Sequence, residues 1–142
     1  MKRKANAVWT GTLKEGKGTL TTGSNALSNH PYSFGSRFEE QAKPGTNPEE
    51  LLAAAEAGCF TMALGLAISQ AGHTPEEVRT EATAEMVNED GKWSIRRMHL
   101  VTRGRASGLD QAEFQRLAEA TKQNCIVSRA LNLEFTLDAK LE

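Results

Sequence analysis

The stretch that decides the fold is residues 47–64, which read Asn47-Pro48-Glu49-Glu50-Leu51-Leu52-Ala53-Ala54-Ala55-Glu56-Ala57-Gly58-Cys59-Phe60-Thr61-Met62-Ala63-Leu64. Asn47 is a strong helix N-cap, Pro48 suits the first helical position, and Glu50 stands at the capping-box position. We expect the helix to end near Gly72, because a glycine there provides a stop. The helix is apolar along most of its length and carries Cys59 midway. This pattern predicts a central helix that is buried on most sides.

Length and charge limit the classes of function. A chain of 142 residues fits one domain over residues 1–142. Its 17 basic and 18 acidic residues nearly cancel, which argues against nucleic acid or an anionic membrane as a partner. The first nine residues contain no apolar run of the kind that a signal peptide requires. We therefore expect a cytoplasmic protein, in which a disulfide is more often transient and catalytic than structural.

A membrane-spanning role for the apolar helix is the alternative to a core position. Residues 51–71 are long enough to raise the question, but Glu49 and Glu50 flank them and Glu56 interrupts them. A lone span with acidic flanks is an unusual anchor. The sequence therefore favours a core helix and no membrane partner.

The remaining elements are strands and a second helix. Asp110 is a cap with Glu113 three residues later, and this pattern predicts a helix to about Asn124, followed by a short helical turn at 125–131. In the segment 32–38, aromatic side chains share one face and Arg37 points to the other. Alternating apolar residues and turn signals predict strands at residues 8–13, 19–22, 32–38, 78–87, 93–103 and 133–141. The order of elements indicates an α+β fold with mostly antiparallel strands.

Two cysteines are present, and their contexts differ. Cys59 lies within the apolar helix, where we expect it to be buried, and Cys125 lies at the end of the second predicted helix. One buried thiol and one thiol at a helix end suggest a redox pair rather than a disulfide-stapled scaffold. The three histidines show no spacing with the cysteines that is typical of a zinc site.

The chain resembles the OsmC/Ohr family, the osmotically inducible and organic hydroperoxide resistance proteins. The motifs that carry the resemblance are Arg37-Phe38-Glu39, the run at residues 45–51, the run Gly58-Cys59-Phe60, and Cys125-Ile126-Val127-Ser128 before a final strand. The similarity extends from Ala7-Val8-Trp9 to the terminal strand, and the position of Arg37 is more similar to the OsmC branch. In the family, proline usually follows the second cysteine, whereas this chain has Ile126.

The resemblance implies a fold, an activity and a set of site residues. It implies an OsmC-like fold in an intertwined homodimer, and a thiol peroxidase of the stress response that reduces organic hydroperoxides and, less specifically, hydrogen peroxide. Cys59 matches the peroxidatic cysteine, Cys125 the resolving cysteine, and Arg37 and Glu49 the charged partners of the reactive thiol. The implied reductant is a dithiol of the lipoyl type. No metal, haem or flavin cofactor is expected.

The chemistry of peroxide reduction gives its own reason to group these residues. A thiolate must attack the O–O bond, and burial in the helix together with the charge of Glu56 disfavours the charged form of Cys59. An arginine offsets this, because it stays charged when buried and bridges a thiolate and a carboxylate with its forked donors. Arg37 is the residue that the family match nominates, with Glu49 holding its guanidinium. Cys125 stands where a helical turn begins, so backbone N–H groups favour its thiolate.

Each of these residues also has a purely structural interpretation. Cys59 is in that case a small core hydrophobe, Arg37 a surface residue, and Glu49 a stabiliser of the helix N-terminus. Ten residues of ideal helix separate Glu49 from Cys59, about 15 Å along the axis. Either a second protomer supplies part of the cluster, or Glu49 reaches from a bent helix start.

Two other functions remain open at this point. The first is a non-enzymatic, stress-related binding or scaffold protein on the same fold, for which Cys59, Cys125 and Arg37 are not needed. The second is a hydrolase with Cys59 as its nucleophile, which requires a base near the cysteine.

Overall fold

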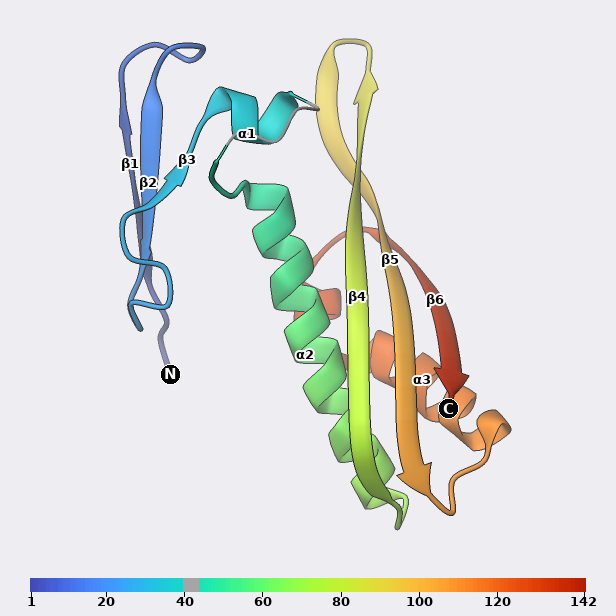
Figure 1. Cartoon of the computed structure of the whole chain (residues 1–142). Helices are drawn as coiled ribbons and strands as arrows, with labels where there is room; N and C mark the ends of the chain where they lie inside the picture. Colours follow the sequence, from blue (N-terminus) through green and yellow to red (C-terminus); the bar gives the residue numbers. More distant parts are fainter. Residues whose placement is uncertain (40–43) are drawn as a thin grey trace. The chain divides into compact units, whose positions relative to one another are not determined.

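The helix that the sequence predicts after Asn47 is the longest helix of the molecule. The structure is a computed structural model that describes residues 1–39 and 44–142, and in it helix α2 runs Pro48–Gln70 (Figure 1). The Asn47 side-chain oxygen accepts a hydrogen bond of 2.8 Å from the Glu50 backbone N–H, as an N-cap does. At the other end Gly72 adopts φ +90°, a conformation that favours glycine. Both predicted ends of the helix are confirmed.

The chain divides into two compact units, Met1–Leu51 and Leu52–Glu142. The first contains an antiparallel three-stranded sheet in the order β1-β2-β3. Its strands are β1 Ala5–Thr10, β2 Lys17–Thr22 and β3 His30–Tyr32. The first strand ends earlier than predicted, because Gly11 turns the chain with φ +95°. Leu13 therefore lies in the turn and is exposed.

The prediction of a strand at residues 32–38 is wrong for most of its length. Residues Phe34–Phe38 form the short helix α1. Ser33 caps it, since its hydroxyl accepts from the Ser36 N–H at 3.1 Å while the Ser36 hydroxyl accepts from the Ser33 N–H at 2.9 Å. The rings of Phe34 and Phe38 lie 5.0 Å apart, which is the i, i+4 pairing of a helix face. Arg37 is therefore a helical residue.

The second unit is built on a long hairpin. Strand β4 runs Thr74–Glu89 and strand β5 runs Lys92–Ser107, and both are longer than the sequence pattern predicts. Asp90 and Gly91 join them with φ 52° and φ 80°, as in a type I′ turn. Strand β6, Glu134–Leu141, pairs in parallel with β5, whereas β4 pairs with β5 antiparallel. The fold is thus α+β with mostly antiparallel pairing, as predicted.

Two further helices follow the hairpin, and both match the sequence prediction. Helix α3 runs Gln111–Asn124, and the Asp110 carboxylate accepts from the Glu113 N–H at 2.8 Å. Helix α4 runs Ile126–Ala130 directly after it. Cys125 is the residue between the two helices.

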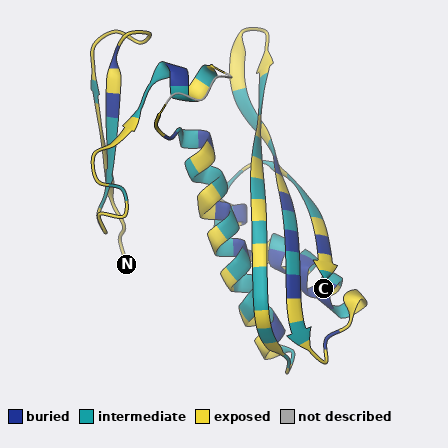
Figure 2. Ribbon diagram, in the orientation of Figure 1, coloured by how far each residue is buried: buried dark blue, intermediate teal, exposed yellow. Residues whose placement is uncertain are grey.

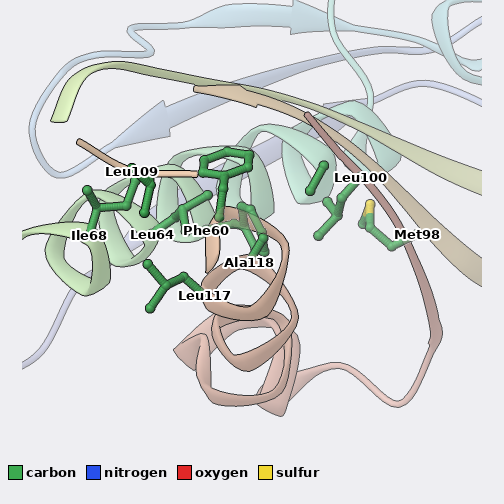
Figure 3. Close-up of a cluster of buried hydrophobic side chains, with 10 residues drawn as sticks. Phe60, Leu64, Ile68, Met98, Leu100, Leu109, Leu117 and Ala118 are labelled. Carbon is green, nitrogen blue, oxygen red and sulfur yellow. The ribbon is translucent and has the colours of Figure 1, made fainter. Parts of the chain in front are cut away.

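The helices of the second unit pack on one face of its sheet. On β5 the residues that point to this face are buried: Met98, Leu100, Thr102 and Gly104. Figure 3 shows Phe60, Leu64 and Ile68 of α2 pointing towards Leu117 and Ala118 of α3. The predicted apolar face of the last strand packs against the same core. Burial of this face supplies the main stabilisation of the unit.

Helix α2 buries one side only. Its buried positions recur every four residues at Glu56, Phe60, Leu64 and Ile68, and the opposite side is exposed (Figure 2). The helix is long and apolar enough to cross a membrane, yet only 22% of that apolar window is buried inside the chain. The prediction of a helix buried on most sides does not hold within one chain. The helix is apolar on both faces, but the rest of the chain packs against only one of them, so the other face stays exposed.

Gly104 gives a test of the core. A Cβ atom added there would lie 2.5 Å from the Phe114 ring, and Phe114 is fully buried. We expect Gly104→Val to lower the free energy of unfolding by about 1–3 kcal/mol through overpacking, as measured by urea denaturation. An unchanged midpoint would show that the Phe114 ring has room to move.

Candidate active site

The two cysteines, far apart in sequence, meet in the second unit. Cys59 lies midway along α2 and Cys125 lies between α3 and α4, and their sulfur atoms are 2.9 Å apart. Both are free thiols. A disulfide requires about 2.05 Å between the sulfur atoms, so bond formation needs only a small shift of the side chains.

The burial of the two thiols is the reverse of the prediction. Cys125 is the buried one, with 2% of its surface exposed, whereas Cys59 is partly exposed. The reason lies in the helix: Cys59 is adjacent to Phe60, which belongs to the buried stripe, and so Cys59 lies on the border of that stripe. A partly exposed thiol is accessible to a reagent, as a nucleophile must be.

The surroundings of Cys125 keep it in the thiol form. Burial raises the pKa of the Cys125 thiol, and its hydrogen bond to Cys59 raises it further, while the Ser128 N–H, the Ser128 hydroxyl and the Val127 N–H act in the opposite direction. The prediction that backbone N–H groups favour the Cys125 thiolate is therefore outweighed by burial. In the bond between the two sulfur atoms, the Cys125 thiol donates and Cys59 accepts.

Ile126, which replaces the proline usual in the family, fits the local geometry. It is the first residue of α4, and Cys125 before it has φ −55° and ψ 133°. The first helical position tolerates proline because its N–H has no partner within the helix. A non-proline residue there keeps the same backbone path.

A second contact joins α2 and α4 beside the sulfur atoms. The Ser128 hydroxyl donates a hydrogen bond of 2.6 Å to Glu56 Oε1. Glu56 is fully buried and Ser128 is 8% exposed. Sequence reasoning considered Glu56 only as a nearby charge and missed its partner, although the Cys-x-x-Ser spacing at residues 125–128 was a signal for Ser128.

The charged pair that the sequence predicts is formed in the first unit. Arg37 Nη2 lies 2.7 Å from Glu49 Oε1, and Arg37 Nε donates to the two carboxylate oxygens at 3.1 and 3.2 Å. This is a forked, bidentate arrangement, which fixes the direction of the guanidinium. The Glu49 side chain is 10% exposed and that of Arg37 41%. The structure thus brings together Cys59 with Cys125, and Arg37 with Glu49, each pair within its own unit.

Each pair adjoins a hollow. Beside Arg37 the hollow has a volume of about 200 Å³ and a mainly aromatic lining, made by Trp9, Leu13, Tyr32, Ser33, Phe34, Arg37 and Phe38. Beside Cys125 it has a volume of about 260 Å³ and is lined by Ala63, Leu66, Ala67, Gln70, Ala120, Thr121, Asn124 and Cys125. Of the large apolar side chains near Cys59 on α2, Leu66 lines this hollow, Phe60 lies in the core and Met62 is exposed. Within residues 1–39 and 44–142, no group of three or more potential ligands is placed to hold a metal ion.

Comparison with known proteins gives consistent matches over the whole chain. The family model described as OsmC-like protein matches residues 40–140. The chain is 40% identical to the protein named Peroxiredoxin OsmC of Escherichia coli over 99% of this chain and 96% of that protein. The organic hydroperoxide resistance protein OhrB of Bacillus subtilis is 25% identical, with TM-score 0.74, over 96% of this chain and 98% of that one. An OsmC-like protein of unknown function from Vibrio cholerae, 16% identical with TM-score 0.77 over 99% of both chains, shares the fold.

The raised pKa of Cys125 predicts how stability depends on pH. The folded protein holds the Cys125 proton to a higher pH than the unfolded chain, so this stabilisation is present below the unfolded value of about 8.5. It is lost as the pH rises through the folded value. We expect the free energy of unfolding, measured in urea with reductant present, to decline above about pH 8.5. The decline should be shallower in Cys125→Ala, and equal slopes would contradict this assignment.

Proposed function

The chain belongs to the OsmC family, and from this premise we propose that it is a cysteine-based peroxidase that reduces organic hydroperoxides and, less specifically, hydrogen peroxide. The observation that carries the proposal is the 2.9 Å approach of the Cys59 and Cys125 sulfur atoms. The hydrogen-bonding partner of Cys59 is a second thiol, which suits redox chemistry better than the histidine-assisted attack of a hydrolase. A purely scaffolding protein has no need of such a pair.

The proposed reaction has three steps. The Cys59 thiolate attacks the terminal peroxide oxygen, the O–O bond breaks, and the alkoxide leaves and takes a proton from solvent to become the alcohol, so that Cys59 carries a sulfenic acid. The Cys125 sulfur then attacks the Cys59 sulfur, the S–O bond breaks, and hydroxide leaves and is protonated to water. A dithiol of the lipoyl type reduces the disulfide and restores both thiols.

Two features support Cys59 as the attacking thiolate. It is the more accessible of the two cysteines, and the neighbouring Cys125 thiol donates a hydrogen bond to its sulfur. A donor aimed at the sulfur stabilises negative charge there. Cys125, held as a thiol by burial, suits the second step.

We assign Arg37 the role of the cation that stabilises the Cys59 thiolate and the developing charge on the peroxide, with Glu49 holding the guanidinium. The bidentate contact of Arg37 with Glu49 supports this role, because it fixes the fork while leaving the Arg37 side chain 41% exposed. Arg37 and Glu49 belong to the first unit, and the two cysteines belong to the second. The Arg37 that acts on a given Cys59 thiolate comes either from the same protomer or from its partner.

The aromatic hollow beside Arg37 supports an organic substrate. Its lining is mainly the side chains of Trp9, Leu13, Tyr32, Phe34 and Phe38, which bind apolar groups through burial. An alkyl or aryl hydroperoxide offers an apolar group for such a hollow, whereas hydrogen peroxide does not. We therefore propose a preference for organic hydroperoxides.

A second copy of the chain is the occupant that we propose for the exposed side of α2. Met62 and Leu66 are 76% and 59% exposed there, and small residues beside them allow close approach of another surface. We place the protein in the cytoplasm as a homodimer with one domain over residues 1–142, acting in the stress response without nucleic acid or membrane partners.

The dimer is tested by sedimentation velocity. We expect the wild-type protein to sediment as a dimer and Met62→Glu to shift it towards the monomer, because a charge would be buried in the interface. Val8→Glu, at an apolar residue that is 60% exposed, is the matched control and should remain dimeric. A monomeric wild type, or one that binds phospholipid vesicles through α2, would contradict the proposal.

The roles of the two thiols predict different defects. Cys59→Ser should abolish consumption of cumene hydroperoxide, because a hydroxyl is far less nucleophilic than a thiolate at neutral pH. Cys125→Ser should still reduce one equivalent and leave a sulfenic acid or a more oxidised Cys59, while turnover with a dithiol is lost. Peroxide consumption and intact mass are the measurements. Retained turnover in Cys59→Ser would refute its role.

The role of Arg37 predicts a slower first step. Arg37→Ala should reduce the second-order rate constant for cumene hydroperoxide by about tenfold to a hundredfold, less than for a fully buried donor because the side chain is partly exposed. Arg37→Lys should recover part of the rate, since lysine keeps the charge but not the fork. Arg79→Ala, which removes another ion-paired arginine, is the control. Equal rates in Arg37→Ala and this control would place Arg37 outside the site.

A further inference from the structure

The two thiols lie at one end of a row of neighbouring polar side chains. Glu56 precedes Cys59 by about one turn of α2, and Ser128 follows Cys125 within α4. The Ser128 hydroxyl donates to Glu56 Oε1 at 2.6 Å, and the Ser128 side chain also interacts with the Cys125 thiol, whose pKa it lowers. A carboxyl group, a hydroxyl and two thiols are thus connected in the order Glu56, Ser128, Cys125, Cys59.

The burial of Glu56 is not explained by packing. Its side chain is fully buried, and Oε2 has no hydrogen-bond partner. Across residues 1–39 and 44–142, no cation forms an ion pair with it. A buried carboxyl group with an unpaired oxygen costs free energy that an apolar residue of similar size would not. A buried polar atom without a partner calls for an explanation, and a catalytic or redox role is one that suits a carboxyl group beside two thiols.

We propose that Glu56, acting through the Ser128 hydroxyl, takes up the proton of Cys125 when this thiol attacks the sulfenic acid on Cys59. The inference rests on the proposed function, of which it assigns the second step. Ser128 is the group that touches the reacting sulfur, and Glu56 acts through it as a positioning residue. The need for such a pair is clear from the site, because burial keeps Cys125 protonated and a thiol must lose its proton to attack.

The proton and electron balance of the step is complete. The Cys125 sulfur gives an electron pair to the Cys59 sulfur, the S–S bond forms, and the S–O bond breaks with its electrons on the oxygen. In the reduced protein the Cys125 S–H is directed at Cys59. Once Cys59 carries the sulfenic acid, the Cys125 S–H turns to the Ser128 oxygen and its proton passes there, while the Ser128 proton passes to Glu56. The departing hydroxide takes a proton from solvent. When the dithiol later releases the Cys125 thiolate, the proton held by Glu56 returns to it along the same path.

Ellman's reagent, an aromatic disulfide, isolates this step without peroxide. Cys59 attacks the reagent and releases one coloured thiolate. Cys125 then attacks the mixed disulfide on Cys59 and releases a second. The first phase depends on the reagent concentration and reports on Cys59, whereas the second is intramolecular and reports on Cys125.

Glu56→Gln keeps the size of the side chain but cannot take up a proton. We expect its second phase to be slower by about a hundredfold at pH 7, the low end of what a positioned general base contributes. The deficit should narrow as the pH rises, because solvent then removes the Cys125 proton. In Glu56→Gln, the rate of disulfide formation after one equivalent of cumene hydroperoxide should be lower than in the wild type by the same factor. This difference in rate should also become smaller as the pH rises.

Three further variants complete the design. Ser128→Ala should reproduce the deficit and its pH dependence, since it breaks the path without altering Glu56. Ser128→Thr should recover part of the rate because it restores a hydroxyl. Glu119→Gln, which removes an exposed carboxylate on α3, controls for loss of charge.

Two results would overturn the inference. One is a second phase in Glu56→Gln as fast as in the wild type. The other is a deficit of the same size at every pH, which indicates displaced sulfur atoms rather than a lost proton acceptor. A wild-type protein that shows both phases but consumes no peroxide would instead refute the proposed function, and the Ellman arm would still decide the role of Glu56.

Discussion

The contact between the Cys59 and Cys125 sulfur atoms is the interaction on which the site depends. It exists because α3 ends and α4 begins at Cys125, where the break between the helices places the Cys125 sulfur against Cys59 in the middle of α2. The buried stripe of α2, continued by Phe60, holds the helix against the core of the second unit. The same packing that stabilises the fold therefore sets the distance between the thiols.

The difference in burial gives the Cys59 and Cys125 thiols different roles in the proposed reaction. In the proposed reaction, partial exposure lets Cys59 meet a peroxide, and burial keeps Cys125 in the thiol form until its partner is oxidised. A second thiol beside the reactive one would then limit the time that a sulfenic acid survives, and so protect Cys59 from further oxidation. The buried carboxyl group of Glu56 lies one turn away, where a proton acceptor for the reserve thiol is needed.

Local signals accounted for much of the fold. The caps Asn47 and Asp110 and the Asp90-Gly91 turn act through neighbouring residues, so the sequence alone located both long helices and the hairpin. The segment at residues 34–38 was misassigned because aromatic residues two and four apart fit a strand and a helix alike, and the Ser33 cap decided between them. The pairing of Glu56 with Ser128 and the reversed burial of the cysteines depend on how α2, α3 and α4 pack, which no local pattern reports.

The most direct test of the account is the covalent state of the protein after one equivalent of cumene hydroperoxide. The oxidised protein is digested without reductant and its peptides are analysed by mass spectrometry. The account predicts one disulfide that links Cys59 to Cys125 within a single chain, because their sulfur atoms already lie 2.9 Å apart. A disulfide between two copies of Cys59, or an over-oxidised Cys59 beside a free Cys125 thiol, would contradict it.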